Sequence, residues 1–415
     1  MSSPAPAAPA VAPDLARWND EVVAFLEAHA PRRAQQPGRF RWGVGPDRVA
    51  LFSEPDRAEE ATEITAARAW RRTVYEAGFG WITGPPEYGG RGLPPAYQRA
   101  YQDVERRYDT PSQSPFMISL GMVAPTVLTH GVEHIRRRYL PALYRGAVIG
   151  CQLFSEPGAG SDLASIATKA VREGDRWIVD GQKVWTSGAH YSDIGLLLAR
   201  TSPGPRHRNL TAFLVDMAAP GVDVRPLRQM TGGAAFNEVF LTGVAVPDDH
   251  RLGDVDGGWT VALTTLMHER NSVGGAGGGA GILATARLIE TARRFGHADD
   301  PRTRQALASV YARLAVARYT RLRAEARRRS GMPPGPEGSI AKLAHTRNLA
   351  AVADLMTGML GPRLIAESGD WGTWAWAEFV LGVPGFRLGG GTDEIQRNIL
   401  AERVLGLPKD APPEQ

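Results

Sequence analysis

The hydrophobic period of this sequence changes twice, and these changes constrain the fold more than any other feature. Apolar residues recur at helical spacing over 14–146, short apolar or alternating runs replace them over 147–256, and helical spacing returns over 257–408. A period near 3.6 is typical of amphipathic helices, and a period of two is typical of half-buried strands. The sequence therefore predicts an α+β multidomain fold, with an N-terminal helical domain, a middle β-barrel or sandwich domain and a C-terminal helical domain.

The two ends and the composition set further limits. Residues 1–13 are rich in Pro and Ala and lack the basic start and apolar core of a signal peptide, so we expect a disordered lead-in, and 409–415 reads as a tail. Apolar residues make up 43% of the chain, and no apolar run approaches 18 residues, so we expect no membrane insertion. The single cysteine, Cys151, precludes an internal disulfide and fits a reducing, cytoplasmic location.

The charge distribution gives little support to nucleic-acid binding. The formal net charge is only +4, and the one dense basic run is RYTRLRAEARRRSG, 318–331. This run reads as the solvated face of a helix, because no aromatic stacking platform accompanies it.

Turn signals divide the middle region into strands. KAVREGDRWIVDGQKVWTSG alternates in hydrophobicity, and both Gly174 and Asp180-Gly181 occupy natural hairpin positions. GLLLAR, LTAFLVDM, VDVRPL and NEVFLTGVAV follow as further short strands.

The stretch CQLFSEPGAGSD, 151–162, has the composition of a ligand-binding turn. An expected strand runs into Pro157-Gly158-Ala159-Gly160, where glycine lets a ligand approach the backbone closely. Ser155 and Ser161 add hydroxyl groups, and exposed N–H groups in such a turn bind anions. A plain β-turn is the alternative. The stretch is not a dinucleotide-binding fingerprint, because the third glycine and the following helix are missing.

A second stretch, GQKVWTSGAH at 181–190, ends a strand at a glycine. Its Trp185, Thr186 and Ser187 combine an aromatic ring with two hydroxyl groups. Such a group either belongs to the core or flanks a planar heterocycle and bonds its edge.

Together with GGTDEIQRNILAERVLGLP near the C-terminus, these two motifs resemble the acyl-CoA dehydrogenase family over roughly residues 15–408. The resemblance implies a helical domain, a β-barrel and a C-terminal four-helix bundle, with FAD as cofactor and no metal. It implies that Trp185 packs on the isoalloxazine, beside Thr186 and with Ser187 near flavin N5. Thr392 and Glu394 would contact the nucleotide part of FAD, and Arg294 the pyrophosphate of a neighbouring subunit's FAD. The motif around 151–162 would line flavin and substrate through Leu153, Phe154, Ser155, Gly160 and Ser161.

The family's dehydrogenation needs a carboxylate base. One branch carries it immediately before Gly-Thr, where this chain has Gly390; only the backbone N–H of that residue remains, to polarise the thioester carbonyl. A second branch takes the base from the first helix of the C-terminal domain. There Glu269 aligns with the base, and Arg270 follows as a substrate contact. A solvated Glu-Arg pair is the alternative reading.

Other carboxylates are weaker candidates for the base. Asp393 lies within the nucleotide motif, and Glu378 and Glu238 match no family position.

The segment NSVGGAGGGAG, 271–281, continues the helical pattern although it holds six glycines. Each glycine costs about 1 kcal/mol in a helix interior. Close helix packing explains them, or a wide acyl cavity suited to a bulky, branched or ring-bearing acyl group.

The expected function is FAD-dependent α,β-dehydrogenation of an acyl-CoA in fatty acid or lipid metabolism. Electrons would pass to an electron-transfer flavoprotein, and the protein would form a homo- or heterotetramer. Two alternatives remain: a non-catalytic, FAD-supporting subunit of a heteromeric dehydrogenase, and an O2-using flavin oxidase or monooxygenase of the same fold.

Overall fold

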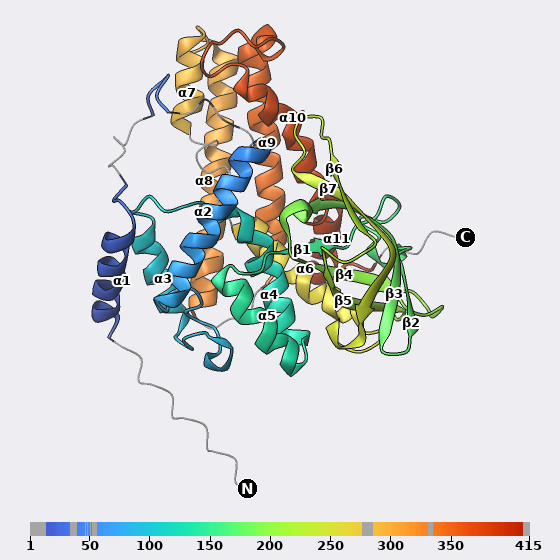
Figure 1. Ribbon diagram of the computed structural model, residues 1–415. Helices are drawn as coiled ribbons and strands as arrows, with labels where there is room; N and C mark the ends of the chain where they lie inside the picture. Colours follow the sequence, from blue (N-terminus) through green and yellow to red (C-terminus); the bar gives the residue numbers. More distant parts are fainter. Residues whose placement is uncertain are drawn as a thin grey trace.

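The chain folds into a helical N-terminal part, a sheet-rich middle part and a helical C-terminal part (Figure 1). The computed structural model describes residues 14–33, 40–45, 47, 49, 51, 56–275, 285–330 and 335–409, with the side chains of all but 270–275 and 328–329. The order of a helical, a sheet-rich and a second helical zone, expected from the change of hydrophobic period, is confirmed. In the described part of the chain, no helix is both long enough and apolar enough to cross a membrane.

The N-terminal helices present apolar stripes to shared cores. In the first of them, Trp18, Val22 and Leu26 recur at helical spacing and are fully buried. Asp56 caps the second by accepting from two backbone N–H groups. The helices are α1 (Leu15–His29), α2 (Arg57–Glu76), α3 (Pro95–Glu105), α4 (Ala124–His130) and α5 (Glu133–Arg145).

A π-helical turn, Ser119–Val123, runs directly into α4. Neither this turn nor α4 is singled out by sequence periodicity. The hydroxyl of Ser119 accepts from the N–H of Gly150 at 2.7 Å and so fixes the turn to the first strand of the sheet.

The middle part is one eight-stranded sheet within the described residues, ordered β6-β7-β3-β2-β4-β5-β8, with β1 parallel to β4. The strands are β1 (Gly150–Leu153), β2 (Lys169–Glu173), β3 (Arg176–Ser187), β4 (Ile194–Arg200), β5 (Leu210–Asp216), β6 (Val222–Leu227), β7 (Phe236–Pro247) and β8 (Arg251–Leu252). Short 3-10 turns lie at Pro86–Tyr88, Ser114–Phe116, Leu163–Ser165, Ala189–Tyr191, Asp248–His250 and Gly361–Leu364.

The hairpin predicted at Asp180-Gly181 is wrong. The chain turns at Gly174, as expected, but β3 then continues through Asp180 with only a shift of register against β7. Asp180 accepts from the N–H of Gly243 at 2.8 Å, across the two strands. Gly181 is needed for space, since a Cβ there would lie 2.3 Å from the hydroxyl of Thr168.

The C-terminal part is built from long helices. They are α6 (Gly258–Gly275), α7 (Thr285–Arg294), α8 (Pro301–Arg329), α9 (Glu337–Leu360), α10 (Ala375–Leu388) and α11 (Asp393–Arg403). Sequence periodicity does not separate α10, whose apolar residues surround the whole helix and which holds Pro384. The glycine-rich segment enters α6 as far as residue 275, and its remaining residues lie outside the described ones.

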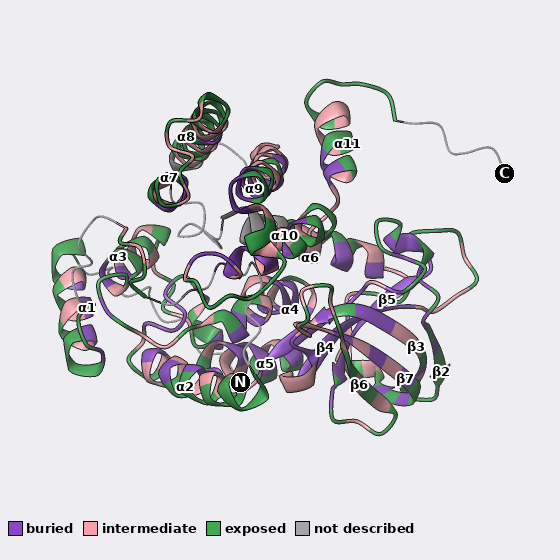
Figure 2. Cartoon of the chain, turned by 90° about the horizontal axis from the view of Figure 1, so that it is seen from above, coloured by how far each residue is buried: buried purple, intermediate pink, exposed green. Residues whose placement is uncertain are grey.

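Helix α6 has a central position. It packs on β5, on the π-helical turn, on α4 and on α9, and so joins the sheet to the C-terminal helices (Figure 2). Its buried Val261 and Ala262 belong to the core shared by α4, α5 and one face of the sheet. Because α6 touches all three parts, a side chain on it can face residues from each.

Candidate active site

The two motifs of the middle part lie against each other. The N–H of Val184 donates to the carbonyl of Ser155 at 2.9 Å. The ammonium of Lys183 donates to the carbonyls of Phe154 at 3.0 Å and of Leu198 at 2.8 Å. Strand β3, which carries Trp185, therefore holds the turn that contains Gly158 and Gly160.

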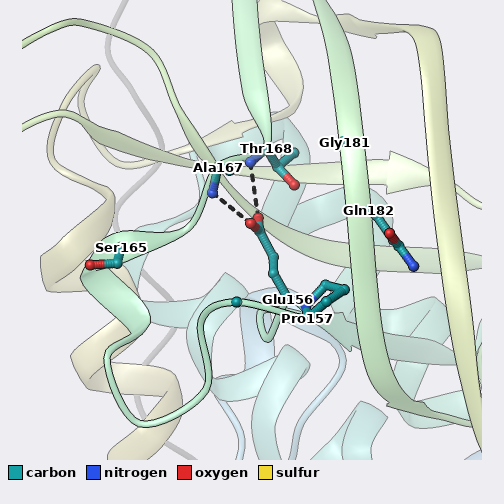
Figure 3. A pocket seen from close by; sticks show the side chains of 8 residues that line it. Glu156, Pro157, Ser165, Ala167, Thr168, Gly181 and Gln182 are labelled. Carbon is teal, nitrogen blue, oxygen red and sulfur yellow. Dashed lines mark hydrogen bonds between the residues drawn. The ribbon is translucent and has the colours of Figure 1, made fainter.

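A buried ion pair fixes this turn. Lys183 Nζ lies 2.8 Å from Glu156 Oε1, and the two side chains are 0% and 7% exposed. Glu156 also accepts from the N–H groups of Ala167 at 2.5 Å and Thr168 at 3.0 Å (Figure 3). Burial opposes ionisation of Glu156, but Lys183 and these donors hold its pKa below its usual range. Burial lowers the pKa of Lys183 to about 8. The ion pair and its hydrogen bonds thus fix the position of the turn.

A cavity of about 280 Å³ opens behind the same turn, between Pro157 and Gly158 on one side and Gly181 and Gln182 on the other (Figure 3). Its one carboxylate, Glu156, is already bonded as described, so the cavity offers no free charge for chemistry.

Trp185 stands on strained backbone. Its φ is +61°, a conformation rare for a side chain of this size, at a shift of register between β3 and β7. The ring is 58% exposed and packs edge-on against Phe236, with centroids 5.8 Å apart. Such strain costs about 1–3 kcal/mol and gathers at binding sites.

Beside Trp185, buried polar atoms lack partners. Thr186 and Asn237 are 1% and 0% exposed, and among the described residues neither the hydroxyl of Thr186 nor the amide oxygen of Asn237 has a hydrogen-bond partner. Ser187 is half-buried. An orphaned polar atom in a native fold needs a reason, and a bound ligand supplies one.

The glycines of the turn fit a closely approaching ligand. A Cβ added to Gly158 or Gly160 would meet nothing within 4 Å, and neither residue has the left-handed φ that requires glycine. The protein itself thus gives no reason for glycine at these two positions. An exposed ring, an unpartnered hydroxyl and two glycines with open space beside them together fit a flat heterocycle such as the flavin of FAD.

The other residues predicted from the stretch 151–162 differ from one another in burial. Leu153 is fully buried in the core on one face of the sheet, and Phe154 is 3% exposed in the core on the other face. Their burial does not support direct contact with a ligand. Ser155 is half-buried, and Ser161 is exposed.

The glycine turn before α11 is held by two side chains. Gly390 and Gly391 have φ of +67° and +82°, where only glycine is unstrained. Lys342, on α9, donates to the carbonyls of Gly389 and Gly391. Gln396, on α11, donates to the carbonyl of Gly390 at 3.1 Å. No backbone or side-chain acceptor of the described residues bonds the N–H of Gly390.

Asp393 cannot act readily as a base. It is 1% exposed and accepts from Thr346 at 2.8 Å and from Arg387 at 3.0 Å. Burial acts against its ionisation, but Thr346 and Arg387 hold its pKa below the usual range. Both oxygens are therefore occupied.

The two residues predicted for the nucleotide end lie at the start of α11. Thr392 caps this helix by accepting from the N–H of Ile395 at 3.2 Å. Glu394 is exposed and bonds Arg397 at 2.9 Å.

Glu269 lies on α6, half-buried, and accepts from the amide of Gln152 on β1 at 3.4 Å. It is also close enough to Lys342 for their charges to interact. The residues that surround Glu269 thus come from the sheet and from α9. Neither Gln152 nor Lys342 is found from sequence motifs; the one available signal is a lysine within the apolar run of α9.

The structure describes the two predicted arginines only in part. The side chain of Arg270 lies outside the described residues. Arg294 is exposed at the end of α7.

Comparisons with known proteins agree with this arrangement. The chain matches the acyl-CoA dehydrogenase N-terminal domain over residues 49–147, the middle domain over 151–244 and the C-terminal domain over 256–405. Acyl-CoA dehydrogenase IpdE1 of Mycobacterium tuberculosis is 38% identical over 386 residues, which cover 91% of this chain and 98% of that protein.

Solved structures show the same fold. The Tcur3481-Tcur3483 steroid ACAD has a TM-score of 0.73 at 27% identity and covers 95% of this chain and 98% of its own. The ChsE4-ChsE5 complex from Mycobacterium tuberculosis has a TM-score of 0.68 at 25% identity and covers 97% and 100%. The chain therefore belongs to the acyl-CoA dehydrogenase family and is an oxidoreductase of that class.

Proposed function

We propose that the protein introduces a Cα–Cβ double bond into an acyl-CoA thioester, with Glu269 as the base that removes the α-proton. One observation carries this proposal. Glu269 lies close enough to Lys342 for their charges to influence each other, and Lys342 bonds the carbonyls on both sides of Gly390. A carboxylate and an unbonded backbone N–H from distant parts of the sequence thus lie around one lysine.

The N–H of Gly390 supports the proposal as a donor to the thioester oxygen. Removal of an α-proton places negative charge on this oxygen, and a fixed donor stabilises it. Loss of one such donor typically slows a reaction by about 10²–10³-fold. The loss of a carboxylate at position 390 therefore leaves this second function intact, because it requires no side chain.

FAD is the cofactor that the family implies, and the residues of the middle part fit it. Trp185 would pack against the flavin, with Thr186, Ser187 and the turn at Gly160 around it, and Thr392 would contact the nucleotide end. When bound, FAD accepts the β-hydride at flavin N5. We expect an electron-transfer flavoprotein to reoxidise it.

For the acyl group we propose a bulky, ring-bearing chain. A similar solved structure is described as a steroid ACAD. Six glycines follow Glu269 in the sequence within 271–281, and the first two of them belong to α6. Absence of side chains there suits a wide acyl group better than a straight one.

We also propose that the protein forms a tetramer, either alone or with a related chain. Helix α8 is mostly exposed (Figure 2), and large apolar side chains lie on it unburied. They are Tyr311, Val316, Tyr319 and Leu322. Exposed apolar surface of this kind marks a protein interface. Since two similar solved structures are described by pairs of chains, a heteromeric assembly is the second candidate.

The test is to purify the protein and expose it without oxygen to a panel of acyl-CoAs. The proposal predicts bound FAD that is bleached by ring-bearing acyl-CoAs and more slowly by straight-chain ones. Bound flavin that no thioester reduces would instead favour the FAD-supporting subunit. Reoxidation of reduced flavin by O2 at the rate of turnover would favour the oxidase.

A further inference from the structure

Lys342 is a buried lysine whose ammonium bonds backbone carbonyl oxygens. It is 4% exposed within α9, and its ammonium donates to the carbonyl of Gly389 and, at 3.1 Å, to that of Gly391. Burial of an ammonium costs several kcal/mol unless its hydrogen bonds are replaced. A buried positive charge aimed at a catalytic turn therefore needs an explanation beyond packing.

The geometry of the peptide bond supplies one. The carbonyl of Gly389 and the N–H of Gly390 belong to the same peptide unit, and in a trans peptide they point in opposite directions. Lys342 holds the oxygen of this unit. The N–H of Gly390 consequently points away from the ammonium, and its direction is set by Lys342.

The charge also changes the strength of this donor. A cation bonded to a carbonyl oxygen draws electron density from the peptide, and hydrogen bonds in a chain strengthen one another by about 10–30% each. Glycine at 389, 390 and 391 contributes no side chain to fix the turn, so its orientation depends on such contacts.

We propose that Lys342 is a positioning residue that orients and polarises the Gly389–Gly390 peptide, so that the N–H of Gly390 becomes a stronger donor to a thioester oxygen. This inference rests on the proposed function of Gly390. The burial of Lys342 lowers its pKa, while the charges of Asp393 and Glu269 oppose that decrease.

Gln396 offers a matched comparison. Its amide donates to the carbonyl of Gly390 at 3.1 Å and to that of Gly391 at 3.4 Å. The carbonyl of Gly390 shares a peptide unit with the N–H of Gly391. Gln396 therefore holds the same turn but not the peptide that carries the N–H of Gly390. Its loss loosens the turn without removing the polarising charge.

The experiment uses acetyl-CoA labelled with ¹³C at the thioester carbonyl as a probe on the FAD-loaded protein. Acetyl-CoA has no β-carbon and cannot be dehydrogenated, so it reports only on the carbonyl. Infrared difference spectra would be recorded for the parent, Lys342→Met, Lys342→Gln, Lys342→Arg and Gln396→Met. Flavin absorbance confirms that each variant retains its cofactor.

We expect the bound carbonyl stretch of the parent to move to lower wavenumber. Lys342→Met should lose more than half of this displacement, Lys342→Gln should lose part of it, and Lys342→Arg should restore most of it. Gln396→Met should keep more of it than Lys342→Met. With an acyl-CoA that bleaches the parent, Lys342→Met should lower the limiting rate of flavin reduction by about 10–100-fold, below the loss expected for removing a donor outright. The apparent dissociation constant should change far less.

Two outcomes overturn different claims. If the carbonyl stretch is displaced equally in the parent and in Lys342→Met or Lys342→Gln, only the role of Lys342 is contradicted. No displacement in the parent contradicts the proposed donor role of Gly390, and with it the inference. If Lys342→Met does not fold, Lys342→Gln and Lys342→Arg decide the question by the same comparison.

Discussion

Replacement of Lys183 by Met tests how much the buried ion pair with Glu156 stabilises the turn at 157–160. The ammonium of Lys183 bonds Glu156 and the carbonyls of Phe154 and Leu198, and it is fully buried. Met has a similar stem and no charge, so the substitution preserves most packing. It leaves the carboxylate of Glu156 buried without its cation.

The magnitude follows from this geometry. Removal of one member of a buried ion pair costs about 3–5 kcal/mol, because the remaining charge stays desolvated. Glu156 keeps its two backbone donors, from Ala167 and Thr168. We therefore expect the lower end, about 3 kcal/mol, which for a chain of 415 residues corresponds to a decrease of Tm by about 3–4 °C.

Thermal unfolding of the cofactor-free proteins, followed by circular dichroism, measures this change. Arg17→Met is the matched control, since Arg17 pairs with Glu21 at 3.4 Å with exposed fractions of 79% and 40%. An exposed pair contributes about 0–1 kcal/mol. If Lys183→Met lowers Tm no more than Arg17→Met, the buried pair does not support the turn.

Two further predictions concern the same region. Gly160→Ala should leave the Tm of the cofactor-free protein unchanged but lower the ratio of FAD to protein, because its Cβ meets only the space assigned to the cofactor. Gly181→Ala should lower the free energy of unfolding by about 1–3 kcal/mol, because its Cβ lies 2.3 Å from the hydroxyl of Thr168. Despite burial, Lys183 and backbone donors depress the pKa of Glu156, so its contribution to stability is present above about pH 4.5 and is lost as the pH falls further. A pH series of unfolding free energies should decrease below that pH, and Glu156→Gln should decrease less steeply.

The sequence predicts the helical and sheet-rich parts because their periodicity is local. Asp180-Gly181 shows where this fails: the pair has the composition of a hairpin, yet Gly181 is required by the proximity of Thr168, which lies just before β2. Helix α10 is apolar on all sides, so it shows no amphipathic stripe.

Of the candidate site, only the residues that lie within family motifs can be predicted from the sequence. Trp185 and Gly390 are found from motifs, but the strained φ of the first and the hydrogen-bonding surroundings of the second are tertiary features. Lys342 and Gln152 are contributed by elements outside the motifs, and nothing local marks either as a neighbour of Glu269.

The most direct test of the central claim is the rate at which an acyl-CoA reduces the flavin of Glu269→Gln. The substitution is nearly isosteric and removes the carboxylate that would accept the proton, together with its charge, so FAD content should equal that of the parent. The control is Glu378→Gln, which changes a half-buried carboxylate on α10. We predict that Glu269→Gln reduces its flavin about 10²–10⁴-fold more slowly in a stopped-flow measurement without oxygen, while the control retains the parent rate. Reduction of Glu269→Gln at the parent rate by the same acyl-CoA would contradict the assignment of Glu269 as the base.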